Sequence, residues 1–193
     1  LVGNWYSELA AEELVAYDDK VSDLPLLAAQ PVKGAVQSSK ALAGLEAKEL
    51  ILSNGVKVIL KPTTFKNDEL LFSAFSPGGS SLYGDSDYYS ASEAGDLVNS
   101  SGVGQLNTVE LQKYLTGKKV NVSPYIGERT EGLSGISDKE GLKTMFEMLY
   151  AYFTAPRIED DVFQGYIMTS KSMLQNRDSD PGFVFQEAIL NTL

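Results

Sequence analysis

Alternating apolar and polar residues in the first half of the chain predict antiparallel strands. The stretch ELILSNGVKVIL, residues 49–60, places Asn54 and Gly55 between two runs rich in β-branched residues. This pattern predicts a hairpin with a type I′ turn, in which both central residues have positive φ. Residues 69–79 predict a third strand that ends in a Pro-Gly-Gly turn.

Helical spacing of apolar residues predicts five helices, at residues 87–100, 108–118, 139–156, 160–176 and 181–190. Thr108 and Asp138 are the predicted N-caps of the second and third helices, and Pro181 opens the last. The third helix carries a wide apolar stripe made of Leu142, Met145, Phe146, Leu149, Tyr150 and Phe153.

Residues 119–128 and 130–138 predict a second pair of antiparallel strands, joined by a tight turn near Arg129. The order of elements is then three strands, two helices, two strands and three helices, with hairpins in place of crossovers. This order predicts the α+β class, with an antiparallel sheet and helices packed on one face.

The first 45 residues have a different pattern. Residues 7–20 predict a helix capped by Ser7, and residues 21–45 predict an extended linker that Leu24, Leu26 and Leu27 hold against a surface. We therefore expect residues 1–45 to be the tail of a preceding domain with an interdomain linker, and residues 46–193 to be the domain proper. Because the chain starts at Leu1, we also expect it to be part of a longer protein.

Composition narrows the chemistry that is available. The net charge of −10 disfavours nucleic acid as a partner, and the sequence has no apolar run long enough to insert into a membrane. The chain contains no cysteine and no histidine. It therefore lacks the imidazole of a Ser-His-Asp arrangement and the usual nitrogen and sulfur ligands of zinc.

Three stretches together resemble the pitrilysin/insulinase family of zinc metallopeptidases, the inverzincins. They are LSNGVKVIL, then SPGGSSLYGDSDYYSASEA, then APRIEDDVFQGYIMTSKSMLQNRDSDP. In that family a hairpin is followed by a strand with a glycine-containing end, by a helix bearing H-x-x-E-H, and by a long later helix. The resemblance covers about residues 46–193, and it implies the α+β metallopeptidase fold of the LuxS/MPP-like type.

The resemblance places the zinc motif on Ser90-Ala-Ser-Glu-Ala94. Ser90 and Ala94 stand where the two histidines would be, and Glu93 stands where the family has its general base. The family's third zinc ligand, a downstream glutamate, falls near Ser172 and Met173, where there is no carboxylate. The resemblance thus implies a domain with a degenerate motif, no catalytic residue and no metal site.

Members of the family combine four similar units, of which one carries zinc. This chain resembles the first unit of the inactive second half. The resemblance implies no cofactor in the chain itself and zinc in the catalytic domain of a parent metalloendopeptidase. Its partners would be the other domains of the same polypeptide and a peptide substrate, and the parent would be periplasmic or exported.

Two tyrosines are candidate contacts for a peptide, and the sequence leaves two alternative functions open. Tyr88 and Tyr89 open the former catalytic helix and are candidate peptide contacts, although half-buried packing is the alternative. The chain could instead be a structural scaffold or interaction domain of a fully non-proteolytic relative. A further alternative is a histidine-free hydrolase that uses Glu93 with Asp96, three residues apart on one helix.

Overall fold

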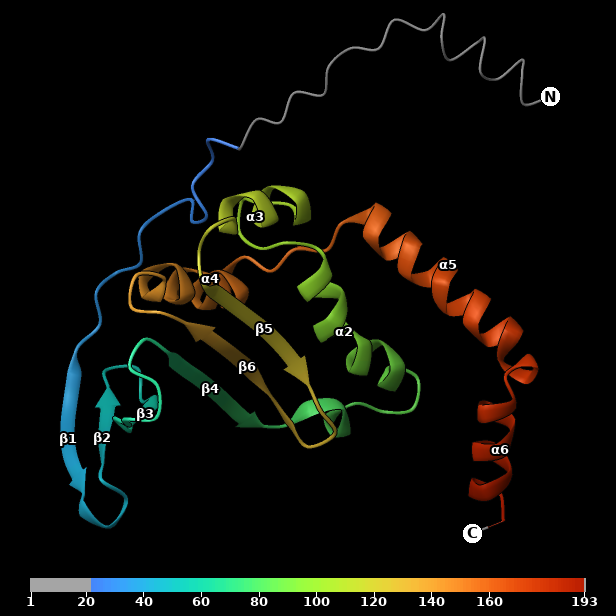
Figure 1. Ribbon diagram of the computed structural model, residues 1–193, viewed down its shortest axis with the longest axis horizontal. Helices are drawn as coiled ribbons and strands as arrows, with labels where there is room; N and C mark the ends of the chain where they lie inside the picture. Colours follow the sequence, from blue (N-terminus) through green and yellow to red (C-terminus); the bar gives the residue numbers. More distant parts are fainter. Residues whose placement is uncertain (1–21, 193) are drawn as a thin grey trace, which may run out of the picture.

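The structure is a computed structural model that describes residues 22–192. The helix predicted over residues 7–20 lies outside the described residues. The described part has the predicted α+β class, with antiparallel strands and helices (Figure 1). The strands form two three-stranded sheets, whereas the sequence predicted a single sheet.

The first sheet has the order β1-β2-β3, with β1 (Val36–Leu42), β2 (Ala47–Leu52) and β3 (Lys57–Leu60). The predicted hairpin is β2 and β3, and its turn has Gly55 at φ +84°. Positive φ is found at Gly55 and not at Asn54, so the predicted type I′ turn is wrong. Instead the Asn54 side chain accepts a hydrogen bond from the backbone of Val56, which closes the turn locally.

Strand β1 was not predicted, because residues 36–42 lie in the segment read as an extended linker. This strand pairs antiparallel with β2 along its length, with Ser39 opposite Leu50 and Leu42 opposite Ala47. The first residues of the segment are also held, since Leu26 and Leu27 are buried in the main core. Leu24 is exposed, so two of the three predicted anchoring leucines are buried.

The second sheet has the order β4-β6-β5, with β4 (Leu70–Pro77), β5 (Val120–Ile126) and β6 (Thr130–Ser137). Strands β5 and β6 form the predicted pair around Arg129. Ala74, Pro124 and Leu133 are opposite one another in the register, so they share one face of the sheet. Val122 and Leu133 on this face are buried, whereas Leu71 and Phe75 on the other face are exposed.

Five helices follow the predicted positions closely. They are α2 (Tyr88–Ser100), α3 (Thr108–Leu115), α4 (Leu142–Thr154), α5 (Asp160–Asn176) and α6 (Pro181–Leu190). Two caps differ from the prediction. The N-cap of α3 is Asn107, which shares a capping box with Glu110, because Thr108 is already helical. Asp138 does not cap α4 directly; its carboxylate accepts a hydrogen bond from Gly141, the N-cap residue.

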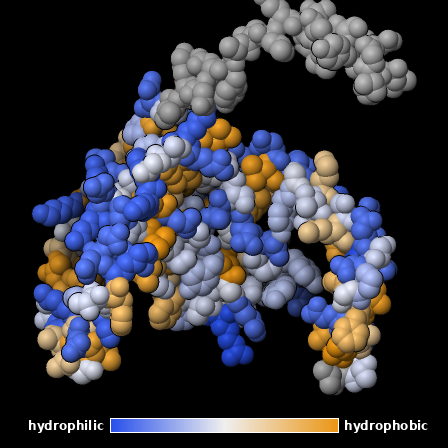
Figure 2. All heavy atoms as spheres, in the orientation of Figure 1, coloured by the Kyte–Doolittle hydropathy of each residue, from blue (hydrophilic) through white to orange (hydrophobic). Residues whose placement is uncertain are grey.

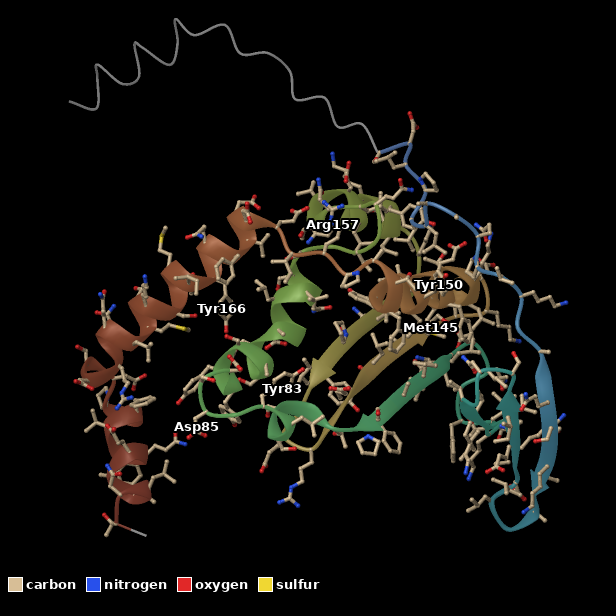
Figure 3. All side chains as sticks on the ribbon, turned by 180° about the vertical axis from the view of Figure 1, so that it is seen from behind. Tyr83, Asp85, Met145, Tyr150, Arg157 and Tyr166 are labelled. Carbon is tan, nitrogen blue, oxygen red and sulfur yellow. The ribbon has the colours of Figure 1, made fainter. Side chains whose placement is uncertain are left out.

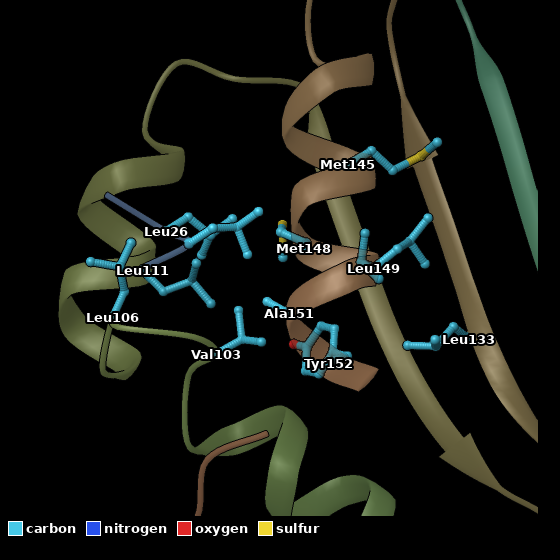
Figure 4. Packing of buried hydrophobic residues seen from close by; sticks show 12 residues of the cluster. Leu26, Val103, Leu106, Leu111, Leu133, Met145, Met148, Leu149, Ala151 and Tyr152 are labelled. Atoms are coloured by element: carbon cyan, nitrogen blue, oxygen red, sulfur yellow. The ribbon is translucent and has the colours of Figure 1, made fainter. Parts of the chain in front are cut away.

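Helix α4 lies between the second sheet and the α3 region, and its buried residues form the centre of the core (Figure 4). The buried side chains of α4 are Thr144, Met145, Met148, Leu149, Ala151 and Tyr152. The predicted stripe is therefore rotated, because Phe146, Tyr150 and Phe153 are exposed. Phe146 still makes an edge-to-face contact with Phe72 of β4, with ring centroids 6.2 Å apart.

Helices α5 and α6 extend away from the core as an arm that contains no buried residue (Figure 1). The space-filling view shows apolar side chains on the outer end of this arm (Figure 2). The connection from α4 is anchored to the loop after α2, where Gly104 donates to the carbonyl of Ala155 and Arg157 donates to the carbonyl of Gly104. Among residues 22–192, no helix is both long and apolar enough to cross a bilayer.

Candidate functional site

Helix α2 carries Ser90, Glu93 and Ala94, on which the resemblance places the zinc motif, and it is set closely against β5. Gly95 allows this approach, since a Cβ there would lie 3.2 Å from the backbone nitrogen of Ile126 and 3.3 Å from the Cα of Tyr125. Ala91, one turn earlier on the same helix, is buried. The predicted helix is thus confirmed, and its position against the sheet follows from small residues on the buried face.

The three motif positions have different surroundings. Ser90 is exposed, and Ala94 is half-buried and lines a pocket between the helix and the sheet. Glu93 is exposed, and its carboxylate accepts a hydrogen bond from the hydroxyl of Tyr166 on α5. Figure 3 shows Tyr166 reaching from α5 toward α2. Glu93 therefore contacts a phenol of the long helix α5.

The Glu93 contact changes the acidity of Tyr166. The hydrogen bond to Glu93 raises the pKa of the Tyr166 hydroxyl above its ordinary value of 10.0, and desolvation and the charges of Glu93 and Asp96 add to the rise. A hydrogen bond from Ser170 acts in the opposite direction. Tyr166 therefore stays protonated and serves as a donor, while the carboxylate serves as the acceptor.

The residues at the motif positions do not fit a zinc ion. A serine hydroxyl and an alanine methyl replace the imidazoles, and alanine offers no donor atom. Ser172 and Met173, where the third ligand was expected, lie on α5 as a serine and a largely exposed methionine. Within residues 22–192, no group of three or more histidine, cysteine, aspartate and glutamate residues is arranged to hold a metal. We therefore derive no metal-dependent hydrolytic step from the described residues.

A pocket of about 360 Å³ lies beside the motif, on the face of the second sheet that the helices cover. Its floor is made by Ala74, Pro124 and Leu133, one from each strand of the sheet. Ala74 and Pro124 have small side chains, which leave the volume of the pocket open. Sequence patterns gave no sign of the pocket, because its floor joins strands that are about 50 residues apart in the chain.

The walls of the pocket come from two helices and from one acidic residue. Ala94, Gly95 and Val98 line it from α2, and Tyr152 and Phe153 line it from the end of α4. The Tyr152 hydroxyl donates to the Asn99 side chain, and burial raises the pKa of this tyrosine.

The acidic residue of the wall is Glu131. It lies on β6 two residues before Leu133, so it is on the same face of the sheet. The residue is half-buried. Among residues 22–192, Glu131 makes no ion pair with a lysine or an arginine.

The structure does not bring Tyr88 and Tyr89 into this pocket. The two rings contact each other edge to face at 5.5 Å, at the exposed start of α2. Their proposed contact with a peptide stays a prediction. Asp96 follows Glu93 on α2, but the Glu93 carboxylate already has Tyr166 as its partner, and nothing in the geometry supports a catalytic carboxylate pair.

Sequence comparisons relate the chain to zinc proteases. It is 25% identical over 185 residues to a zinc protease PQQL-like protein of Arabidopsis thaliana, covering 95% of the chain and 17% of that relative. It is 21% identical over 136 residues to a probable zinc protease PqqL of Haemophilus influenzae, covering 70% of the chain and 15% of that relative. No model of a protein family matches the chain.

Solved structures show the same fold. The periplasmic protease PqqL of Escherichia coli superimposes with a TM-score of 0.76 at 22% identity, covering 99% of the chain and 21% of that protein. A mutant of the ferredoxin protease FusC, in complex with Arabidopsis ferredoxin, gives a TM-score of 0.75 at 21% identity, covering 97% of the chain and 21% of that protein. The chain therefore spans about a fifth of the length of these relatives.

These likenesses define the class of protein. The fold is that of insulinase-like metallopeptidases, and the resemblance to the pitrilysin/insulinase family is confirmed. The chain is similar to PqqL-type zinc proteases and spans about a fifth of the length of the solved one.

Proposed function

We propose that the chain is a non-catalytic domain of a zinc-dependent metalloendopeptidase. The single observation that carries this proposal is that helix α2 forms where the resemblance predicts the zinc-motif helix, with Ser90 and Ala94 at the positions where the resemblance predicts histidines. A bound metal is what lowers the pKa of water toward neutrality, and Glu93 alone cannot supply that activation. Zinc and catalysis then reside in another domain of the parent polypeptide.

In this role the chain would form part of the wall of a proteolytic chamber. Support comes from the second sheet, which is covered by helices on one face and bare on the other. On the bare face Leu71 is paired with Ile136, and Phe75 lies four residues, or two pleat repeats, further along β4. An exposed apolar strip of this kind is suited to contact a peptide or another domain of the same polypeptide.

The names of the relatives support the assignment of the parent. The Arabidopsis and Haemophilus relatives are named zinc proteases, and the Escherichia coli PqqL structure is described as a periplasmic protease. We therefore place the parent among exported or periplasmic proteases that take polypeptide substrates. Cell fractionation of the source organism, with an antibody against this chain, tests the compartment directly.

Metal analysis and a peptidase assay on the purified chain test the central claim. We expect less than stoichiometric zinc after dialysis and no cleavage of a panel of quenched fluorescent peptides. One zinc per chain together with cleavage that a chelator abolishes would contradict the proposal. If the full-length parent is also inert, the chain is instead a scaffold domain of a non-proteolytic relative.

A matched variant controls for the sensitivity of these assays. Ser90→His with Ala94→His restores the two imidazoles one helical turn apart on α2. We expect this double variant to retain more zinc than the wild-type chain, because histidines four residues apart on a helix can share one ion. Since no third ligand is present, the affinity should stay well below that of a complete site.

A further inference from the structure

The pocket beside α2 combines apolar walls with a carboxylate that has no ion-pair partner in the part of the chain that the structure describes. Most of its lining is apolar, including Leu133 of β6 and Tyr152 of α4, and Phe153, which also lines it, is 73% exposed. Glu131 adds a carboxylate that no lysine or arginine of residues 22–192 neutralises. A ligand that matches this pocket must be apolar along most of its length and positively charged at one end.

Among the side chains of a polypeptide, arginine meets both conditions best. Its methylene stem can lie along apolar walls while its guanidinium reaches a carboxylate. The guanidinium is planar and weakly hydrated, so it forms bidentate bonds with a carboxylate and stacks on aromatic rings such as Phe153. The chain's net charge of −10 would also favour the approach of a basic segment.

We propose that this pocket binds an arginine side chain of a polypeptide, with Glu131 as the partner of the guanidinium. The inference rests on the proposed function, because it takes the polypeptide to be a substrate of the parent protease. The motif helix then supplies a wall of a binding site, since Ala94 leaves space at the position where the family has a histidine. Ala94 would thus shape the pocket and would not bind a metal.

Titration of the isotope-labelled chain with capped glycine peptides tests the proposal by nuclear magnetic resonance. The probes carry one central arginine, citrulline or leucine, and the amides of Gly95 and Gly132 in the pocket report binding. Citrulline has the shape of arginine without its charge. We expect the arginine peptide to bind about tenfold more tightly than the citrulline peptide, as a charged hydrogen-bonded pair predicts.

Glu131→Gln is the central variant, since it keeps the shape of the side chain and removes its charge. It should lower the affinity for the arginine peptide about tenfold and leave the affinity for the citrulline peptide unchanged. Glu128→Gln is the matched control, because Glu128 is an exposed acid on the turn before β6 and does not line the pocket. It should change neither affinity.

Two further variants test the walls. Val98→Phe should fill the pocket and abolish binding of all three peptides. If that variant fails to fold, Phe153→Ala serves instead, because its exposed side chain can be removed without opening the core; it should weaken the arginine peptide by about two- to fivefold through loss of the cation–π contact.

Three results would overturn the inference. These are equal affinity for the leucine and arginine peptides, an unchanged arginine affinity in Glu131→Gln, and shift changes that avoid Gly95 and Gly132. The zinc and cleavage assays on the same samples report on the proposed function separately. A chain that binds zinc and cleaves peptides could still hold arginine in this pocket, so the two failures are distinguishable.

Discussion

The body of the molecule and its C-terminal arm are built from similar helices but are held in different ways. Helix α4 places six side chains in the buried core, whereas α5 is longer and places none there. The arm is attached by a few specific contacts, namely the Tyr166–Glu93 hydrogen bond and the Arg157 contacts near Gly104. The body should therefore fold by burying apolar surface, and the arm should be positioned by polar contacts.

The largest expected effect comes from truncating a leucine side chain to alanine, once in the body and once on the arm. Leu106 is fully buried in the body, and Leu174 is 65% exposed on the arm. Leu106→Ala should lower the free energy of unfolding by about 2–5 kcal/mol, because it leaves a cavity in the core. Leu174→Ala should change it by less than about 0.5 kcal/mol. Urea denaturation measures both, and equal losses would remove the distinction between body and arm.

A backbone contact in the body gives the next effect. Gly104 has φ +61°, and a Cβ there would lie 2.2 Å from the carbonyl oxygen of Leu26. Gly117 has φ +79° but open space around it. Gly117→Ala should cost about 1–2 kcal/mol from the left-handed conformation alone.

Gly104→Ala should cost more than Gly117→Ala, because the segment that carries Leu26 must also move. Thermal unfolding of the two variants measures the difference. A smaller loss for Gly104→Ala would show that this segment does not close the core.

The arm should respond to the loss of a single hydroxyl. Tyr166→Phe removes the hydrogen bond to Glu93 and should lower the free energy of unfolding by about 1 kcal/mol or less. The main change should be faster hydrogen exchange at the amides of α5, with no change in α4. Tyr150→Phe on α4 is the control, because no hydrogen bond of the Tyr150 hydroxyl is found within the described residues. Unaltered exchange in α5 would show that other contacts position the arm.

The smallest effect concerns pH. The folded chain raises the pKa of Tyr166 above its unfolded value of about 10, chiefly through the hydrogen bond to Glu93. A raised pKa means that the folded state binds this proton more tightly. The contribution of this proton to the free energy of unfolding is therefore complete below about pH 10, and it is lost as pH rises through the pKa of Tyr166 in the folded chain.

Ultraviolet titration of phenolate checks this direction. The difference between wild-type and Tyr166→Phe should show a tyrosine that ionises late, and Glu93→Gln should bring its pKa down. Glu93, Asp96 and Ser170 are the groups that act on this hydroxyl. A Tyr166 that titrates at its ordinary value would contradict the contact.

Much of the fold was predictable from sequence because it depends on local patterns. The positions of α2, α4, α5 and α6 and of the β2–β3 hairpin follow from periodicity and from turn residues. Strand β1 was missed because its residues show no apolar alternation, and pairing with β2 is what orders it. The buried face of α4 was misjudged because two overlapping apolar stripes are present and only the sheet selects between them.

The candidate site was predictable in part. The helix at Tyr88–Ser100 follows from the sequence, whereas the assignment of Ser90, Glu93 and Ala94 to a degenerate zinc motif stays a prediction. The partner of Glu93 could not be predicted from the sequence, since Tyr166 is 73 residues away and its contact depends on how α5 leaves the core. The pocket at Glu131 could not be predicted either, because its floor is made by residues from neighbouring strands. The boundary between residues 45 and 46, and the role of Tyr88 and Tyr89, stay predictions.

The placement of Leu26 and Leu27 has a consequence for how the chain folds during synthesis. The side chain of Gln105 donates to the carbonyl of Pro25, a contact across 80 residues, and Leu26 and Leu27 pack into the core beside it. A ribosome adding about 5–20 residues per second needs between about 4 and 16 s to deliver the second partner after the first. During that interval these two leucines have no core to enter, so we expect them to be bound by a chaperone on the nascent chain.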